Sequence, residues 1–191
     1  MSLPSVPVLI LIDLQNGMAA AALPPRNNPQ AEENVASLLA AWRSARAPVV
    51  HVRHISKTPG SPFWPGTGGA EFQTRFVPQP QETMFEKNVP DAFVHSGLER
   101  WLRVRDIDRL VIVGVATHNS VESTARTAGN LGFNVTVVAD ATFTFDQPDF
   151  TGRLRTAAEV HAMSLANLAG EYAHVRTTSE VLHALQAGRA A

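Results

Sequence analysis

The sequence predicts an α/β fold in which helices cover a doubly wound, mostly parallel sheet. Apolar runs of strand length alternate with stretches of helical periodicity along the whole chain, as in successive β-α-β units with right-handed crossovers. The first run, VPVLILIDL at residues 6–14, is continuous and rich in branched side chains, which is typical of a strand buried on both faces. No repeat or linker interrupts the pattern, so we expect a single domain over residues 1–191.

The first half of the chain continues with a helix, a strand and a long loop. Asn28 and Pro29 match a helix cap followed by a proline in the first turn. Apolar residues then recur at helical spacing, at Val35, Leu38, Leu39 and Trp42. Residues 48–55 form the second predicted strand. Residues 57–80 are rich in Gly, Pro and aromatic residues, and a loop of that length in a compact domain often forms a lid or a pocket wall.

The second half repeats the alternation. Residues 82–87 form a short extended segment, and Ser96 with Glu99 matches a capping box. That box begins a helix expected to bury Leu98, Trp101 and Leu102. A long helix is predicted over residues 151–170 with Leu154, Ala158, Leu165 and Leu168 on one side. The other predicted elements are strands at 109–117, 134–143 and, at the sheet edge, 173–177, a helix beginning near Ser120, and a closing helix at 179–187.

Composition excludes several classes of function. The formal net charge is −1 and 17% of residues are charged, so nothing favours binding to nucleic acid or to an anionic membrane. The chain has no cysteine, which excludes disulfides and thiolate metal sites. The apolar run near the N-terminus lacks a basic leader and a cleavage site and breaks at Asp13, too early to span a bilayer. We therefore expect a cytoplasmic protein that acts on a small molecule.

Two polar residues follow predicted strands directly. Asp13 ends the first strand, and Ser120 lies in the turn between strand 109–117 and the next helix. Ligands of doubly wound sheets bind beyond the carboxyl ends of the strands, where the winding direction reverses. If these two strands are neighbours there, Asp13 and Ser120 face each other. Asp13 also fits a turn residue, although an unpaired carboxylate after a buried strand is costly.

Ser120 has both a structural and a functional interpretation. Serine caps helices well, and Asn119 with Glu122 matches a capping box. A hydroxyl at a helix N-terminus also lies near amides that can receive an oxyanion. Lys87 alone would most simply be solvated, but with Asp13 it completes a chemical set. Asp13 would act as base and proton shuttle, Lys87 would hold Asp13 ionised, and residue 120 would attack.

Four segments carry a resemblance to a known family. They are LILIDLQNGM at residues 9–18, HISKTPGSPFWPGTGGAEF at 54–72, FEKNVPDAF at 85–93 and GVATHNSVESTARTAGNLGFNVTVVADAT at 114–142. From about residue 9 to 175 the chain resembles the isochorismatase-like (cysteine) hydrolase superfamily, which includes nicotinamidases, N-carbamoylsarcosine amidohydrolase and ureide hydrolases. The resemblance implies a three-layer α/β/α sandwich with a mostly parallel six-stranded sheet, no cofactor, and a homo-oligomer such as a dimer or tetramer.

The resemblance also assigns roles to individual residues. It implies Asp13, Lys87 and position 120 as the catalytic residues. It implies a cis peptide bond between Val115 and Ala116, which a protein keeps only where the surrounding structure enforces it. The amides of Ala116 and Ser120 would then form the oxyanion hole. We predict substrate contacts at Gln15, His54, Phe63, Trp64 and Val115; Phe63 and Trp64 could instead pin the long loop to the core.

Position 120 departs from the family pattern because a serine stands where its amidases have a cysteine. Three explanations fit: an engineered Cys→Ser change that traps a ligand, a natural serine with weak or altered activity, or a relative of the true isochorismatases. Those enzymes cleave a vinyl ether with the aspartate as general acid and need no cysteine. We favour a hydrolase of a small amide, lactam or ureide, with vinyl-ether hydrolysis or a silent binding role as alternatives.

The histidines carry weaker signals. His51 and His54 suggest a metal site, but residues three apart on a strand point to opposite faces and loop 57–80 offers no further histidine, so we expect no metal. Arg53 fits either a contact with a substrate carboxylate or a surface ion pair, and we favour the ion pair. His118 fits a turn residue, and His161 fits a hydrogen-bonded core residue.

Overall fold

The central element is a six-stranded sheet. The structure, a computed structural model, describes residues 6–20 and 23–189. The expectation that the N-terminal segment is not a leader peptide concerns residues 1–5 in part, and these lie outside the described residues. The strand order is β3-β2-β1-β4-β5-β8 and every pairing is parallel. The strands are β1 (Val8–Ile12), β2 (Val49–His54), β3 (Thr83–Lys87), β4 (Arg109–Val115), β5 (Asn134–Phe143) and β8 (His174–Arg176).

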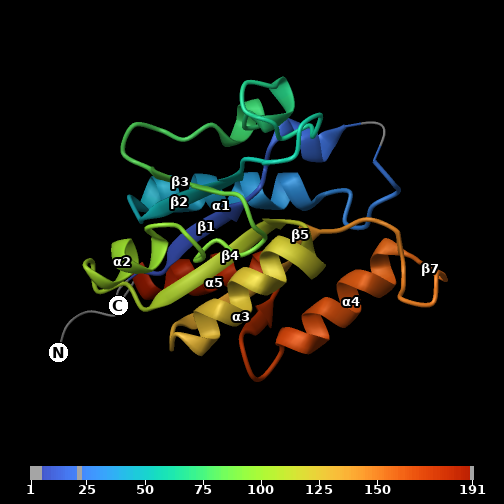
Figure 1. Ribbon diagram of the computed structural model, residues 1–191. Helices are drawn as coiled ribbons and strands as arrows, with labels where there is room; N and C mark the ends of the chain where they lie inside the picture. The colour runs from blue at the N-terminus through green and yellow to red at the C-terminus, as the bar shows by residue number, and fades with distance from the viewer. Residues whose placement is uncertain (1–5, 21–22, 190–191) are drawn as a thin grey trace.

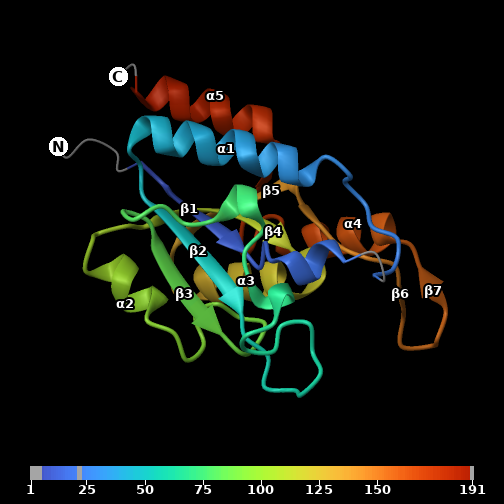
Figure 2. The same cartoon turned by 90° about the horizontal axis from the view of Figure 1, so that it is seen from above.

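Helices cover both faces of this sheet, which confirms the predicted three-layer sandwich. In Figure 1, α2, α3 and α4 lie in front of the sheet and α1 and α5 lie behind it; Figure 2 shows α1 and α5 together on one side. The helices are α1 (Ala31–Ala45), α2 (Leu98–Arg103), α3 (Glu122–Asn130), α4 (Ala157–Leu168) and α5 (Thr178–Arg189). No helix in the described part of the chain is long and apolar enough to cross a bilayer.

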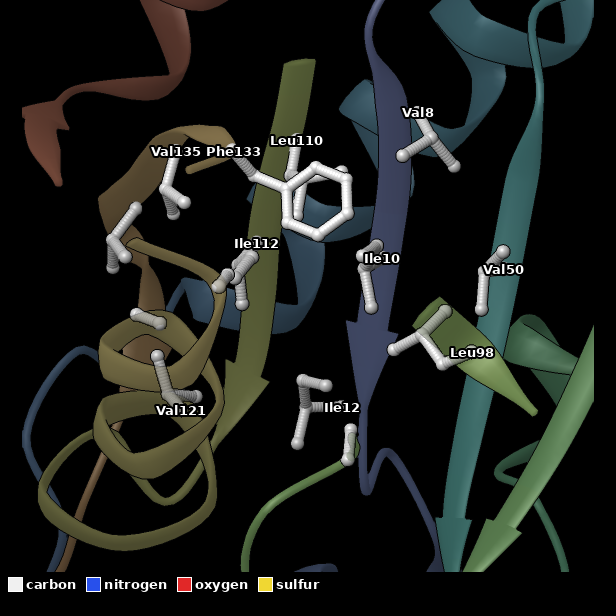
Figure 3. Packing of buried hydrophobic residues seen from close by; sticks show 14 of the residues in the cluster. Val8, Ile10, Ile12, Val50, Leu98, Leu110, Ile112, Val121, Phe133 and Val135 are labelled. Atoms are coloured by element: carbon white, nitrogen blue, oxygen red, sulfur yellow. The ribbon is translucent and has the colours of Figure 1, made fainter. Parts of the chain in front are cut away.

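Side chains of β1 alternate between two hydrophobic cores, one on each face of the sheet. Val8, Ile10 and Ile12 pack toward α2 and α3, as Figure 3 shows, together with Leu98 and Val121 from those helices' segments. Leu9 and Leu11 face the other way, toward α1. The predicted stripe of α1 lines this second core, with Val35, Leu38, Leu39 and Trp42 all buried. A continuous apolar run is therefore buried on both faces, as the sequence predicts.

The winding direction reverses between β1 and β4. The chain moves outward from β1 through β2 to β3, then returns to β4 and continues outward to β5 and β8. β4 pairs in parallel with β1 over the whole length of β1, so their carboxyl ends meet at the switch point. That geometry confirms the condition under which Asp13 and Ser120 face each other.

The predicted helix starts near Asn28 and Ser96 are wrong by a few residues. α1 begins at Ala31, after Pro29, and the Asn28 side chain donates to Ala139 O and Thr142 O instead of capping the helix. α2 begins at Leu98 with Gly97 at its N-cap; the Ser96 hydroxyl donates to the Ala92 carbonyl and accepts from Leu98 N–H, and no capping box with Glu99 forms. In both cases the side chain that the local pattern assigns to the cap donates to a carbonyl outside the helix. Trp101 is only partly buried.

The predicted helix at 151–170 starts later than expected. A two-stranded antiparallel hairpin, β6 (Gln147–Pro148) with β7 (Leu154–Arg155), precedes it. The Asp149 carboxylate accepts from Thr151 N–H and Arg153 N–H, which closes this turn. α4 then begins after Thr156, which forms a capping box with Glu159. Leu154 and Ala158 are consequently exposed, while Leu165 is partly buried and Leu168 fully buried.

Candidate active site

Asp13, Lys87 and Ser120 meet at the switch point. The Lys87 ammonium donates to Asp13 Oδ2 at 2.7 Å and to Ser120 Oγ at 3.2 Å. The side chain of Lys87 is 0% exposed and that of Asp13 is 1% exposed. The three residues come from the ends of β1, β3 and the turn after β4, so the fold joins segments 74 and 33 positions apart.

The backbone around Asp13 is held in an uncommon conformation. Asp13 has φ +52°, a left-handed region that aspartate tolerates better than most residues. Its N–H donates to Val52 O at 2.9 Å, so β2 fixes the end of β1. Gly114, with φ +119°, lies opposite; a Cβ there would meet Ile12 O at 2.1 Å. Only glycine allows β4 to approach β1 this closely beside the aspartate.

Burial is the largest influence on the pKa of Asp13. Removing the carboxyl from water raises the pKa of Asp13 above its usual value of 3.8, while the adjacent Lys87 ammonium acts to lower it. Its Oδ1 atom is buried and has no hydrogen-bond partner among the described residues. A carboxyl with a raised pKa and a free oxygen is suited to accept and return a proton.

Ser120 lies in a π-helical turn, Thr117–Val121, that leads into α3. The peptide bond before this turn, Val115–Ala116, is cis, as the family resemblance implies. The predicted capping box of Asn119 and Glu122 is wrong, because α3 begins at Glu122 with no side-chain cap and Glu122 instead pairs with Arg126. The Ser120 hydroxyl is therefore directed to Lys87 and not to the helix.

Polar side chains from α4 and from the residue that follows β5 brace this turn. Ser164 donates to Thr117 O at 3.0 Å, and His161 Nδ1 lies 2.9 Å from Thr117 Oγ1. His118 Nδ1 contacts Thr144 Oγ1 at 2.5 Å, in keeping with its expected place in the turn. Burial lowers the pKa of His161, which favours the neutral ring. Ser164 and Thr144 were not predicted; the one sequence signal is a serine four residues before Leu168 on the buried side of α4.

Gln15 ties the end of β1 to the neighbouring strand and to loop 57–80. Its Nε2 donates to His54 O and Ala70 O, and its Oε1 accepts from His54 N–H. The side chain is fully buried. Gln15 is thus placed beside the site with its amide occupied by backbone groups, and a substrate contact there remains a prediction.

The aromatic residues of the loop lie near the site in different ways. The Phe63 ring packs edge-on against His54, with centroids 6.0 Å apart. Trp64 is 37% exposed and, with Lys87, lines a cleft of about 490 Å³ beyond β2 and β3. Asp13 and Ser120 are not among the residues lining this cleft. Val115 is fully buried and Ala116 is 8% exposed.

His51 and His54 face opposite sides of the sheet, as predicted. His51 is buried and its Nε2 lies 2.8 Å from Glu82 Oε2, while Arg43 holds the same carboxylate. His54 lies on the side of Asp13 and Lys87, and burial together with the Lys87 charge lowers its pKa. Over residues 6–20 and 23–189, no group of three or more His, Asp or Glu side chains is placed to hold a metal ion.

Arg53 forms the surface ion pair that the sequence suggests. Its guanidinium contacts Glu86 at 2.5 Å and Glu71 at 3.7 Å, with both carboxylates about half exposed or more.

The chain is similar in sequence and in fold to known proteins. Residues 7–180 match the Isochorismatase domain family. The isochorismatase family protein YrdC of Bacillus subtilis is 34% identical over 175 residues, covering 92% of this chain and 94% of the relative. Nicotinamidase 3 of Arabidopsis thaliana is 30% identical over 184 residues, covering 89% and 84%. A crystal structure assigned to the isochorismatase family from Chromobacterium violaceum has a TM-score of 0.92 at 48% identity, covering 95% and 94%. The chain belongs to the isochorismatase family.

Proposed function

We propose that the protein hydrolyses the C–N bond of a small amide, lactam or ureide, with Asp13, Lys87 and Ser120 as its catalytic residues. The observation that carries the proposal is the buried Lys87 ammonium, which lies within hydrogen-bonding distance of both the Asp13 carboxylate and the Ser120 hydroxyl. The similarity to a nicotinamidase, an enzyme named for an amide substrate, supports the same class of reaction.

In the first half of the reaction, Ser120 Oγ attacks the carbonyl carbon while Asp13 accepts the hydroxyl proton. The carbonyl oxygen gains negative charge, which the backbone amides of Ala116 and Ser120 receive at the start of the π-helical turn. Protonated Asp13 then donates its proton to the leaving nitrogen. The C–N bond breaks, the amine or ammonia leaves, and the acyl group remains as an ester of Ser120.

In the second half, Asp13 removes a proton from water, which attacks the ester. The tetrahedral intermediate collapses, and the proton returns from Asp13 to Ser120 Oγ as the carboxylic acid product leaves. The Lys87 ammonium, which donates to Asp13, offsets the charge of the Asp13 carboxylate whenever the proton is away.

Serine makes the attack harder than cysteine would. A thiol is readily ionised by a nearby cation and helix terminus, whereas an alcohol keeps its proton until a base removes it during attack. The raised pKa of Asp13 makes that carboxylate a stronger base than an exposed aspartate. We therefore expect slow turnover with Ser120 and faster turnover with a cysteine in its place.

The same raised pKa also supports a second candidate, hydrolysis of a vinyl ether. In that reaction protonated Asp13 donates its proton to the substrate, and Ser120 has no covalent role. This reaction needs no nucleophile at position 120, so it would proceed equally well in a variant with alanine there.

The test is the release of ammonia or amine from a panel of small amides, lactams and ureides by the native chain and by its Ser120→Cys and Ser120→Ala variants. Intact mass spectrometry would detect an acyl adduct at position 120. Turnover by the cysteine variant with loss of turnover in the alanine variant supports the amide reaction. Absence of turnover by both the native chain and the cysteine variant, with cleavage of isochorismate unaffected by Ser120→Ala, would overturn it in favour of the vinyl-ether reaction. Binding without any turnover would indicate a silent member.

A further inference from the structure

We infer that His161 is a positioning residue of the candidate active site: its ring accepts a hydrogen bond from Thr117 and so holds the turn that carries Ser120 in its reactive geometry. The inference rests on the proposed amide hydrolysis, in which this turn supplies both the nucleophile and the oxyanion amides. His161 lies on α4 and acts through Thr117, the residue that directly follows Ala116 in the chain.

α4 holds Thr117 at two points. Thr117 Oγ1 lies 2.9 Å from His161 Nδ1, and Thr117 O accepts from the Ser164 hydroxyl at 3.0 Å. Positions 161 and 164 are three residues apart, so they lie on the same side of the helix. Thr117 is fully buried, and no side chain caps the turn at its start. The first residue of the turn is therefore fixed by α4.

The surroundings of His161 decide which ring nitrogen accepts. Nε2 lies 3.5 Å from Asn28 Nδ2, but that amide already donates to Ala139 O and to Thr142 O, which uses both of its hydrogens. Burial lowers the pKa of His161, and a neutral imidazole carries its hydrogen on one nitrogen only. Since Nε2 receives no hydrogen from Asn28, the ring hydrogen is on Nε2, and Nδ1 is the acceptor for the Thr117 hydroxyl.

An irregularity in β5 provides the group that Nε2 faces. The register between β4 and β5 shifts between Ile112 and Gly114, as at a β-bulge, which takes residues out of the ladder. The Ala139 carbonyl lies in this part of β5; it accepts from the Asn28 side chain and acts to raise the pKa of His161, as an acceptor of the ring N–H does. The orientation of the ring is thus set by the framework before any substrate binds.

The turn needs this support because of the groups that it carries. Ala116 N–H has no acceptor in the described part of the chain, which suits an amide that receives a developing oxyanion. Ala116 O accepts from Asn119 N–H and Val121 N–H, so a shift at Thr117 would move the amides on both sides of it. A misplacement of about 1 Å in a reacting geometry can lower a rate by about 100-fold.

The test starts from the Ser120→Cys variant, whose thiol is the only one because the native chain has no cysteine. The rate of its alkylation by iodoacetamide, followed by intact mass across pH, reports the surroundings of residue 120, since a thiol ionises more readily beside a cation and a helix N-terminus. kcat and KM are measured with p-nitrophenyl acetate and with the panel of amides, lactams and ureides. NMR of the histidine ring nitrogens in the native chain distinguishes the nitrogen that accepts from the one that carries hydrogen.

Four changes are added singly to Ser120→Cys. His161→Leu removes the acceptor and Thr117→Val removes the donor while keeping the shape of the side chain. His161→Asn places an amide oxygen near the position of Nδ1 and should restore the bond. Leu165→Ala is the matched control, because it loosens the packing of the same helix against the core and leaves the contact with Thr117 in place.

We expect the hydrogen on Nε2 and a change in the Nδ1 signal in Thr117→Val. His161→Leu and Thr117→Val should raise the pH midpoint of alkylation and lower kcat by about tenfold or more, with KM within about twofold of the parent. His161→Asn and Leu165→Ala should stay within about threefold of the parent in kcat. Should His161→Leu not fold, Thr117→Val decides.

A hydrogen on Nδ1, equal effects of His161→Leu and Leu165→Ala, or no effect of Thr117→Val on alkylation would each overturn the inference. Alkylation and NMR results as expected, with no hydrolysis of any probe by the parent, would support the role of His161 in placing residue 120 and overturn the proposed function. Hydrolysis of an amide by the parent that neither His161→Leu nor Thr117→Val alters would do the reverse.

Discussion

Replacing Lys87 by methionine tests whether Asp13 and Lys87 form a charged pair in the folded protein. Methionine has a similar length and volume, so it fills the space and removes only the ammonium. The change leaves Asp13 at 1% exposure with Oδ1 already lacking a partner and Oδ2 without its donor.

The expected cost follows from that burial. Removing one partner of a buried ion pair leaves an uncompensated charge and typically destabilises a protein by about 3–5 kcal/mol. A double variant, Asp13→Asn with Lys87→Met, replaces the pair with neutral groups of similar shape. It should recover most of the loss, because the isolated charge is absent.

The loss should depend on pH with a definite sign. Burial already raises the pKa of Asp13 above 3.8, and Lys87 is the main influence that opposes the rise, so the pKa rises further in the Lys87→Met variant. The folded variant then holds a proton that the unfolded chain releases near pH 3.8. Its free energy of unfolding therefore falls, relative to that of the native chain, as the pH rises above that value, and levels off above the folded pKa.

The assay is urea unfolding of the native chain and of the single and double variants at pH 7 and pH 5, with circular dichroism as the signal. We expect the single variant to be least stable, and its deficit to be smaller at pH 5 than at pH 7. If Lys87→Met unfolds with the native free energy at pH 7, and the deficit does not change with pH, Asp13 is neutral in the native protein. The proposed role of Lys87 as counter-charge would then be wrong.

Three further predictions follow from other contacts. Asp13→Asn removes the proton acceptor and should lower kcat/KM for an amide substrate by about 100-fold or more, measured beside circular dichroism; turnover within about threefold of the parent would remove Asp13 from the mechanism. Gly114→Ala should lower the free energy of unfolding in urea by about 3 kcal/mol or more, because its Cβ would lie 2.1 Å from Ile12 O. The matched control is Gly132→Ala, also at positive φ (+83°) but with nothing within 4 Å, which should cost only about 1 kcal/mol. Equal costs would contradict the close approach. For Glu82, burial alone would raise the pKa, but its bonds to Arg43, Gln79 N–H and His51 lower it from 4.5 to about 2. Its carboxylate thus contributes stability above pH 4.5 that is lost as the pH falls toward 2. In Glu82→Gln the free energy of unfolding should therefore depend less on pH over that range, whereas an unchanged pH dependence would show that the ionised Glu82 carboxylate contributes nothing.

The sequence predicts the framework well where one signal dominates. The run at residues 6–14 becomes β1, buried on both faces, and the stripe of Val35, Leu38, Leu39 and Trp42 becomes the buried side of α1. Here the periodicity of the sequence and the burial in the structure agree. The predicted helix starts are wrong because the hydrogen-bond partners of the expected capping side chains lie outside the local pattern. The Asn28 side chain bonds to carbonyls more than 110 positions away, which no local pattern contains.

The candidate site likewise contains residues that the sequence predicts and contacts that it does not. Asp13 and Ser120 stand out because each follows a buried strand, and strand pairing at the switch point then brings their segments together. Lys87 carries no such signal; only the family resemblance and the fold join it to Asp13. The bracing of the turn by Ser164 and His161 depends on how α4 crosses the sheet, which the sequence does not specify.

The structure weakens the purely structural interpretation of Ser120. A capping serine would direct its oxygen to the N–H groups of the following helix, but neither the π-helical turn nor α3 has a side-chain cap. Its hydroxyl instead accepts from Lys87, which also donates to Asp13. Ser164 and His161 hold the turn from outside through their contacts with Thr117. A hydroxyl beside a buried ammonium and carboxylate supports the proposed role of Ser120 as nucleophile.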